Sequence, residues 1–284
     1  MKPTSESESL SQRRLRRIAG RHNALLKELR HAFARAELTK DGNCAIEGVR
    51  IVEEAVRSGL RFRAIFFRES AQNHADRLLQ QISAHVEALL LPDHLFDSAV
   101  PSETPQGVAA LVRLKQFSLD DVLERVQVGP IIVVAGLQDP GNLGTILRSG
   151  EAFGSAGVVL GEHTVSPLNS KLIRASAGSV FRLPVVVAKN AGGLEAVLAK
   201  LRTQGLAVMA TSSHKGTPID DAKLNVPAAI LIGSEGSGLP RSLMARVDET
   251  VAIPHSAHVE SLNAGVAASI VLYEAARQRR KAGG

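Results

Sequence analysis

Short runs of apolar residues alternate with amphipathic segments along most of the chain. Between Asn43 and Phe117, each apolar run typical of a strand is followed by a segment whose apolar residues recur with the period of a helix. Strands are predicted in CAIEG, RAIFFRES, HVEALLL and VAALVRL, and helices in VRIVEEAVRSG, over 74–82 and over 93–100. This alternation indicates a small α/β domain.

The segment before this domain shows apolar positions at helical spacing. They are Leu15, Ile18, Leu25, Leu26, Leu29 and Phe33. They predict one helix over residues 11–38 with a basic exposed face. Residues 1–12 are polar, and we expect a disordered tail there. The first domain would then cover residues 13–117.

A second α/β series follows a short connecting segment. Residues 118–127, SLDDVLERVQ, predict a linker helix with Ser118 as N-cap and Asp121 three residues later. From 128 to 284, strands are predicted in PIIVVAGL, GVVLG, PVVVA, AVMATSS, AAILIGSEG and ETVAIP, with helices over 142–153, 171–176, in GLEAVLAKLRTQG and at the end. Because several of these strands are continuously apolar, they predict a parallel sheet covered on both faces.

Composition supports two folded domains and adds a charge asymmetry. The chain has 284 residues, 44% of them hydrophobic, which is enough for two cores. Residues 1–40 hold ten Lys/Arg against four Glu, so they carry the whole net charge of +6. A basic end on a neutral body favours a polyanionic partner such as nucleic acid, and a solvated helix face or flexible tail is the alternative.

Several protein classes are disfavoured. No apolar run approaches the roughly 20 residues that cross a bilayer, and the polar N-terminus lacks a secretory signal, so we expect a cytoplasmic protein without a membrane partner. Cys44 is the only cysteine and cannot form an intramolecular disulfide. The absence of Trp and the single Tyr favour recognition of RNA through phosphates and shape over base stacking.

Three strands of the second domain end in polar turns, and ligands of open α/β sheets bind at the carboxyl ends of strands. In the first turn, within residues 136–154, Asp139 precedes Pro-Gly, Asn142 lies at the expected helix start and Arg148 follows six residues later. Asn142 as a helix cap and Arg148 as a surface or ion-paired residue remain the structural alternative.

The second turn, ILIGSEGSGLP over 230–240, combines glycines with an acid. Gly233, Gly236 and Gly238 let the backbone approach a ligand, and Glu235 places a carboxylate there. The turn lacks the GK[ST] ending of a phosphate-binding loop, and no G-x-G-x-x-G follows any predicted strand. A cationic or neutral ligand bearing adenosine fits better than a bare pyrophosphate.

The third turn lies in VAIPHSAHVESLNAGVAASIVLYEA, residues 251–275. Ser261, Leu262 and Asn263 open a helix whose first turns are rich in small residues, which predicts close packing or a ligand, or simply a capped helix. His255 and His258 have a spacing suited to a metal pair, but no third ligand is near in the sequence, so we expect no metal.

Taken in order, NLGTILRS, LIGSEGSGL and IPHSAHVESLNAGVAASIVLYE resemble the three motifs of the SpoU, or TrmH-like, branch of the SPOUT RNA methyltransferases. KDGNCAIEGVRIVEEAVRSG is similar to the ribosomal-protein-like substrate-binding domain that precedes the catalytic domain in many members. The resemblance implies an S-adenosylmethionine-dependent RNA ribose 2′-O-methyltransferase, most readily of ribosomal RNA. It also implies a homodimer formed through the C-terminal domain and a trefoil knot in that domain.

The resemblance also assigns residues. By position, the catalytic group would comprise Asn142, Arg148, Glu235, Ser261 and Asn263. The cofactor would be contacted, largely through backbone groups, by Thr211, Gly233, Ile253 and Leu262. The alternatives are a transfer-RNA 2′-O-methyltransferase and an inactive RNA-binding or ribosome assembly factor of the same fold.

Overall fold

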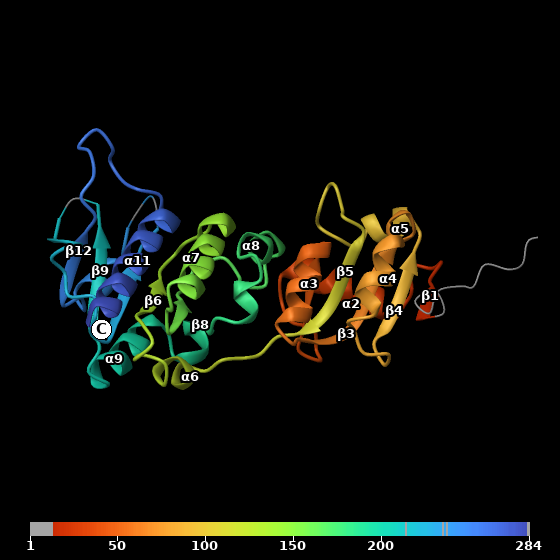
Figure 1. Cartoon of the computed structure of the whole chain (residues 1–284), viewed down its shortest axis with the longest axis horizontal. Coiled ribbons are helices and arrows are strands. Elements are labelled where there is room, and N and C mark those ends of the chain that lie inside the picture. The colour runs from red at the N-terminus through yellow and green to blue at the C-terminus, as the bar shows by residue number, and fades with distance from the viewer. Residues whose placement is uncertain (1–13, 214, 235, 237, 283–284) are drawn as a thin grey trace, which may run out of the picture. The chain divides into compact units, whose positions relative to one another are not determined.

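The computed structural model describes residues 14–213, 215–234, 236 and 238–282 (Figure 1). Contacts divide the chain into two compact units, Met1–Lys115 with Leu168–Ile173, and Gln116–Pro167 with Arg174–Gly284. The tail predicted over residues 1–12 and the predicted site residue Glu235 lie outside the described residues.

The first unit is a five-stranded mixed sheet with helices on both faces. Its elements are β1 (Leu15–Arg17), α2 (Ala24–Arg35), β2 (Asn43–Glu47), α3 (Val49–Arg57), β3 (Arg61–Arg68), η1 (Glu69–Ala71), α4 (Asn73–Leu79), β4 (Glu87–Leu91), α5 (Asp93–Asp97) and β5 (Val108–Arg113). The strand order is β1-β4-β3-β5-β2, with β1, β4 and β3 parallel and β5 antiparallel to both of its neighbours.

The helix predicted over residues 11–38 is wrong in its first half. Leu15–Arg17 form a strand that pairs in parallel with Ala88–Leu90 of β4. The helix begins only at Ala24, where the Asn23 side chain accepts a hydrogen bond from the Leu26 backbone at 3.2 Å. The edge of the sheet thus gives Leu15–Arg17 backbone hydrogen bonds that a helix would otherwise have supplied.

Alternate strand residues of the first unit face two apolar layers. α2 and α5 pack on one face through Leu26, Leu29 and Phe96, which meet Phe66 and other residues of the sheet. Cys44 is buried in β2, and this burial raises the pKa of its thiol to about 12. The thiol is therefore protonated and unreactive at neutral pH.

The second unit contains a seven-stranded sheet in which every pairing is parallel, in the order β10-β12-β9-β11-β6-β7-β8. Its elements are α6 (Leu119–Leu123), β6 (Ile131–Val134), α7 (Pro140–Ala152), β7 (Gly157–Leu160), α8 (Ser170–Ala175), which the division between units crosses, η2 (Ser179–Phe181), β8 (Val185–Val187), η3 (Ala188–Ala191), α9 (Leu194–Thr203), β9 (Ala207–Ser212), β10 (Thr217–Pro218), β11 (Ala228–Ile232), α10 (Arg241–Met244), β12 (Glu249–Ala252) and α11 (Ala264–Ala282). The predicted parallel sheet is confirmed. The short β10 and α10 had no signal in the apolar pattern.

Both faces of this sheet are covered, as its continuously apolar strands require. On one face, Ile131, Val133 and Leu231 pack with apolar residues of α6, α9 and α10. Neighbouring strand residues point the other way, toward α7 and α11, which lie side by side (Figure 1). No helix among the described residues is long and apolar enough to span a bilayer.

The segment predicted as a linker helix belongs structurally to the second unit. Ser118 and Asp121 form the expected capping box, with Ser118 Oγ accepting from the Asp121 backbone at 3.2 Å. Leu119 and Val122 of α6 are buried in the core beneath the parallel sheet. The helix is therefore part of a folded layer.

We predict that Gly144→Ala destabilises the second unit. A Cβ at Gly144 would lie 2.4 Å from the Ala175 Cβ and 2.9 Å from the Ala175 carbonyl carbon, so backbone must move. Such overpacking costs about 1–3 kcal/mol, more than the gain in helix propensity. Urea unfolding measures the loss.

Gly150→Ala is the matched control on the same helix. Its Cβ would meet the tip of the Leu183 side chain at 3.1 Å, which can turn away, so we expect a clearly smaller loss. Equal stability of Gly144→Ala and the wild type would show that α7 is not packed as described.

Candidate active site

The parallel sheet brings the three polar turns to one edge of the second unit. β6, β11 and β12 all run in the same direction, and the turns follow their carboxyl ends. β9 lies between β11 and β12, and its Thr211 pairs with Val251. Residues widely separated in the sequence therefore share one end of the sheet, as the sequence predicted.

At the first turn, α7 begins two residues earlier than predicted, at Pro140. Asp139 is the N-cap, and its Oδ1 accepts a hydrogen bond from the Asn142 backbone at 2.7 Å. Pro140 occupies the first position of the helix, where no backbone N–H is needed. Asn142 is consequently inside the first turn of the helix, and its side chain is not the helix cap. It makes a different contact.

That contact joins the first turn to the third. Asn263 Nδ2 donates to Asn142 Oδ1 at 2.8 Å, across 121 positions of sequence. The same Asn263 side chain caps α11, because its Oδ1 accepts from the Gly265 backbone at 3.0 Å and from the Val266 backbone at 3.2 Å. One amide thus uses its acceptor for the helix and a donor for the neighbouring turn.

Small residues at the start of α11 allow this approach. A Cβ on Gly265 would lie 3.2 Å from the Asn142 carbonyl oxygen and 3.1 Å from the Thr145 Cβ. One turn further, Ser269 Oγ lies 2.7 Å from Ser149 Oγ. The close packing predicted from the small residues is therefore present, and α7 is its partner.

Arg148 lies on α7 but is not brought to the two asparagines by these contacts. Six residues of helix turn the chain by about 240°, so Arg148 and Asn142 project in different directions. The Arg148 side chain is exposed, and among the described residues it makes no hydrogen bond or ion pair. It remains able to bind an anion at the surface of α7.

The second turn is closed by its own backbone. Ser234 and Gly238 form a bridge, with Gly238 N donating to Ser234 O at 3.0 Å and Ser234 N donating to Gly238 O at 3.2 Å. A Cβ on Gly233 would lie 2.5 Å from the Gly238 carbonyl carbon, so only glycine permits this closure. Gly238 has φ +64°, a conformation that also favours glycine.

The remaining predicted residues lie at the same edge. Thr211 Oγ1 donates to the Leu231 carbonyl at 3.2 Å, which ties the ends of β9 and β11 together. Ile253 directly follows β12 and is half-buried. Ser261 is exposed and Leu262 half-buried in the irregular segment before α11, where Asn263 and not Ser261 provides the helix cap.

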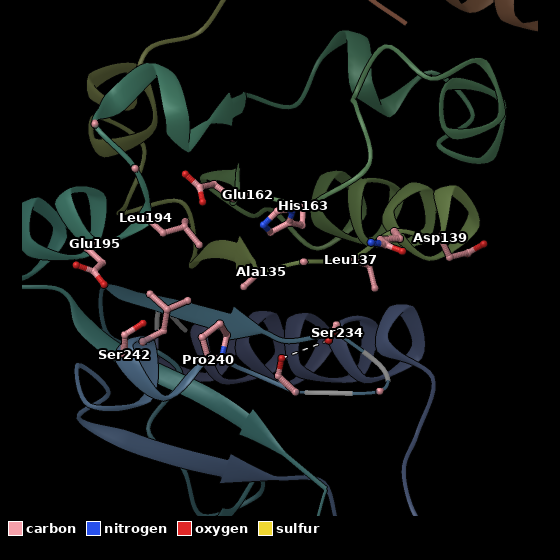
Figure 2. Close-up of a pocket in the computed structure, with 17 residues that line it drawn as sticks. Ala135, Leu137, Asp139, Glu162, His163, Leu194, Glu195, Ser234, Pro240 and Ser242 are labelled. Atoms are coloured by element: carbon pink, nitrogen blue, oxygen red, sulfur yellow. Dashed lines mark hydrogen bonds between the residues drawn. The ribbon is translucent and has the colours of Figure 1, made fainter. Parts of the chain in front are cut away.

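A cleft of about 1030 Å³ lies beside these turns (Figure 2). Its walls come from the ends of β6 and β7, the start of α9, and the turn and short helix that follow β11. Figure 2 shows Glu162 and His163 on one side and Ser234 and Pro240 on the other. β7 and β8 lie on one side of β6 in the sheet, and the strands that come later in the sequence lie on the other side. The strand order therefore reverses at β6, next to the cleft. Ligands of open α/β sheets usually bind at such a position.

Of the eight predicted site residues that the structure describes, none lines this cleft. The lining side chains Gln138, Glu162 and His163 were missed, since no motif marks them. The signal that could have found them is their place directly after apolar strands. His163 also has φ +58°, which is uncommon outside glycine and is associated with functional loops.

The two histidines near β12 do not form a pair around a common ligand in the described structure. His255 Nδ1 donates to the Ile253 carbonyl at 2.7 Å. Among the described residues, no group of three or more His, Cys, Asp and Glu side chains is arranged to hold a metal ion.

A parallel sheet with polar turns gathered at its carboxyl edge is the architecture of an α/β ligand-binding or catalytic domain. Residues 129–273 match the SpoU rRNA methylase family, and the chain belongs to that family. Residues 23–110 match the MRM3-like substrate binding domain. Both resemblances found in the sequence are therefore confirmed.

Similar proteins cover nearly the whole chain. The 23S rRNA (guanosine(2553)-2′-O)-methyltransferase RlmP of Bacillus subtilis is 29% identical over 91% of this chain and 98% of its own. The 23S rRNA (uridine(2479)-2′-O)-methyltransferase of Streptomyces viridochromogenes is 30% identical over 86% of each chain. The crystal structure of the SpoU methyltransferase AviRb from the same organism, in complex with AdoMet, has a TM-score of 0.75 at 29% identity and covers 91% of this chain and 100% of its own.

We predict that the two roles of Asn263 separate on substitution. Asn263→Ala removes the acceptor for the Gly265 and Val266 backbone and should lower the free energy of unfolding by about 1 kcal/mol. Asn263→Asp keeps an acceptor at the helix N-terminus and should retain most of that stability.

Asn142→Ala is the control, because it removes the hydrogen bond between the turns and leaves the Asn263 cap in place. Urea unfolding of the three variants makes the comparison. Equal losses for Asn263→Ala and Asn263→Asp would contradict the capping role.

Proposed function

We propose that the protein is an S-adenosylmethionine-dependent methyltransferase that acts on a ribose 2′-hydroxyl of ribosomal RNA. The observation that carries this proposal is the hydrogen bond between Asn142 and Asn263, which joins the first and third motifs of a chain that belongs to the SpoU family. The two named relatives act on different nucleotides, a guanosine and a uridine, and share the 2′-oxygen as the methylated atom. The ribose is thus the common target.

S-adenosylmethionine is the proposed cofactor, and the described residues suit it. In the turn after β11, a Cβ on Gly236 would meet nothing within 4 Å, so this turn has open space beside its backbone, and no phosphate-binding sequence is present. Thr211, Gly233, Ile253 and Leu262 are the proposed contacts. When bound, the cofactor supplies a methyl group on a positively charged sulfur.

The residues around the 2′-hydroxyl have to position it and favour loss of its proton. Arg148 is the proposed phosphate contact, and its exposed guanidinium, which has no described partner, is free to take this role. A guanidinium does not lose its proton in a protein, so Arg148 acts by lowering the pKa of the 2′-hydroxyl electrostatically. Phosphate or water then accepts the proton.

The other proposed catalytic residues hold the turns in position. Asn142 and Asn263 fix the two turns against each other at the place where the ribose binds. Ser261 and Glu235 complete the group from the third and second motifs. Most of the acceleration in such a transfer comes from aligning two bound reactants, so this positioning is the main task of the turns.

The two units divide the work in this proposal. Residues 13–117 bind RNA, and residues 128–284 carry out the transfer together with the connecting helix of residues 118–127, which packs in their core. The match of residues 23–110 to a substrate-binding domain and the net charge of +6 over residues 1–40 support the first assignment. A cytoplasmic location is also part of the proposal. The trefoil knot of the C-terminal domain stays a prediction.

A homodimer through the C-terminal domain is also part of the proposal. Val266 and Tyr273 are seven residues apart on α11, which places them on one side of the helix, and they are 47% and 49% exposed. Phe153 contacts Tyr273 edge-on, with ring centroids 5.7 Å apart, and extends this apolar surface to the end of α7. A second copy is the proposed partner that covers it.

We predict that Arg148→Ala lowers methyl transfer from labelled S-adenosylmethionine to 23S rRNA by roughly 100-fold or more, as loss of a group that stabilises developing charge does. Cofactor affinity measured by calorimetry should stay near the wild-type value, because Arg148 is not among the proposed cofactor contacts. The assay is run in parallel with transfer RNA, and a preference for transfer RNA would replace the ribosomal substrate.

Arg125→Ala is the matched control, since Arg125 is an exposed arginine of the same unit outside the proposed site. It should methylate as the wild type does. Normal turnover by Arg148→Ala would refute its assigned role, and a wild-type protein that neither binds the cofactor nor transfers methyl would indicate an inactive RNA-binding factor.

We predict that Val266→Glu converts the dimer to a monomer, because a carboxylate would be buried against the second copy without a partner. Sedimentation velocity of the purified protein measures the change. Val226→Glu, at a valine that is 40% exposed outside α7 and α11, should leave the assembly unchanged. A monomeric wild type would exclude the homodimer.

A further inference from the structure

A small basic cavity lies in the first unit, apart from every residue assigned above. It has a volume of about 520 Å³ and is lined by Ala19, Arg21, Arg30, His94, Leu95 and Ser98. Among the residues that the structure describes, the lining contains two arginines, a histidine and a hydroxyl, and no carboxylate. Water occupies roughly 30 Å³ per molecule, so the cavity has ample room for a phosphate group.

Arg30 is held in place at this cavity. Its Nη2 donates to Ser98 Oγ at 2.5 Å, and Ser98 Oγ in turn donates to the Leu95 carbonyl at 2.8 Å. The guanidinium of Arg30, on α2, is therefore fixed against α5. A fixed guanidinium loses less freedom on binding an anion than a mobile one does.

One donor of Arg30 has no acceptor. Its Nε is buried, and among the described residues it finds no hydrogen-bond partner. Because Nε has almost no exposed surface, an anion in the cavity would be met by the Nη atoms of Arg30 and not by Nε. The hydrogen bond that fixes this guanidinium to Ser98 distinguishes the cavity from an ordinary exposed basic patch.

The nearest carboxylates along the chain do not neutralise the cavity. Asp93 and Asp97, which flank His94 and Ser98 in sequence, both pair with Arg68, at 3.5 Å and 2.9 Å. They are thus engaged by a strand residue that does not line the cavity. The charges of Arg21 and Arg30 remain available to an external anion.

From these observations we infer that the cavity formed by Arg21, Arg30, His94 and Ser98 binds a backbone phosphate of the RNA substrate. The inference rests on the proposed function only for the identity of the RNA. RNA is the favoured source of the phosphate because the cavity lies within the unit that matches a substrate-binding domain, and because the net positive charge of the chain is concentrated over residues 1–40. Arginine presents paired donors that suit phosphate oxygens.

The test measures binding of full-length protein to an in-vitro-transcribed 23S rRNA over a series of KCl concentrations. The double variant Arg21→Ala/Arg30→Ala should bind about 10-fold more weakly. The slope of log affinity against log salt should fall in magnitude by about 0.7–0.9, the value for one lost phosphate contact. Arg30→Lys keeps the charge but not the paired donors, so its RNA affinity should lie between those of the wild type and the double variant.

Arg35→Ala is the matched control, because Arg35 lies on the same helix, carries the same charge and does not line the cavity. It should change affinity and slope far less. Equal effects of Arg35→Ala and the double variant would show diffuse attraction and overturn the site. Thermal unfolding shows whether each variant is folded. If the double variant is unstable, the single variant Arg21→Ala replaces it, because Arg21 lies in an exposed turn.

Two further measurements separate the outcomes. In the methyl-transfer assay the double variant should raise KM for RNA and leave kcat and cofactor affinity unchanged. If the wild type binds RNA through the cavity but transfers no methyl, the proposed function fails and the site stands. If inorganic phosphate at matched ionic strength stabilises only the wild type while RNA affinity is the same in both proteins, the cavity binds small anions and the RNA assignment is wrong.

Discussion

The packing of α11 against α7 determines where the polar turns of the second unit lie. Gly265 lets the backbones approach, and Asn263 then reaches Asn142 while it caps its own helix. Because Asp139 caps α7 immediately beside this contact, three short polar side chains fix two helix starts in one place. The site is thus built from helix termini whose backbone groups need partners in any case.

The apolar pattern was a good guide to the second unit and a poorer one near the N-terminus. Strands such as Ile131–Val134 are apolar on both faces, and this property alone predicts a parallel sheet between helices. Leu15 and Ile18 have helical spacing, but the segment that contains Leu15 pairs with β4. That pairing depends on a strand about 70 residues later, which no local pattern contains.

Sequence reasoning located the turns of the site but not their mutual arrangement. Asn263 was recognised as a cap residue and as a motif residue. In the structure its amide group caps α11 and also donates a hydrogen bond to Asn142. Motifs gave no information on the cleft beside Glu162 and His163, which arises from the order of strands in the sheet. The direction of Arg148 likewise follows from helix geometry that a motif does not encode.

The strand order of the large sheet also affects how the protein is made. At the centre of the sheet, β6 pairs with β11, so that Ile132 lies opposite Ile230, about a hundred residues later in the chain. During synthesis β6, β7 and β8 emerge long before the strand that completes the centre, and one edge of β6 stays without its partner until then. The second unit should therefore fold late and slowly, and it has the greatest need for protection from aggregation while the ribosome is still translating it.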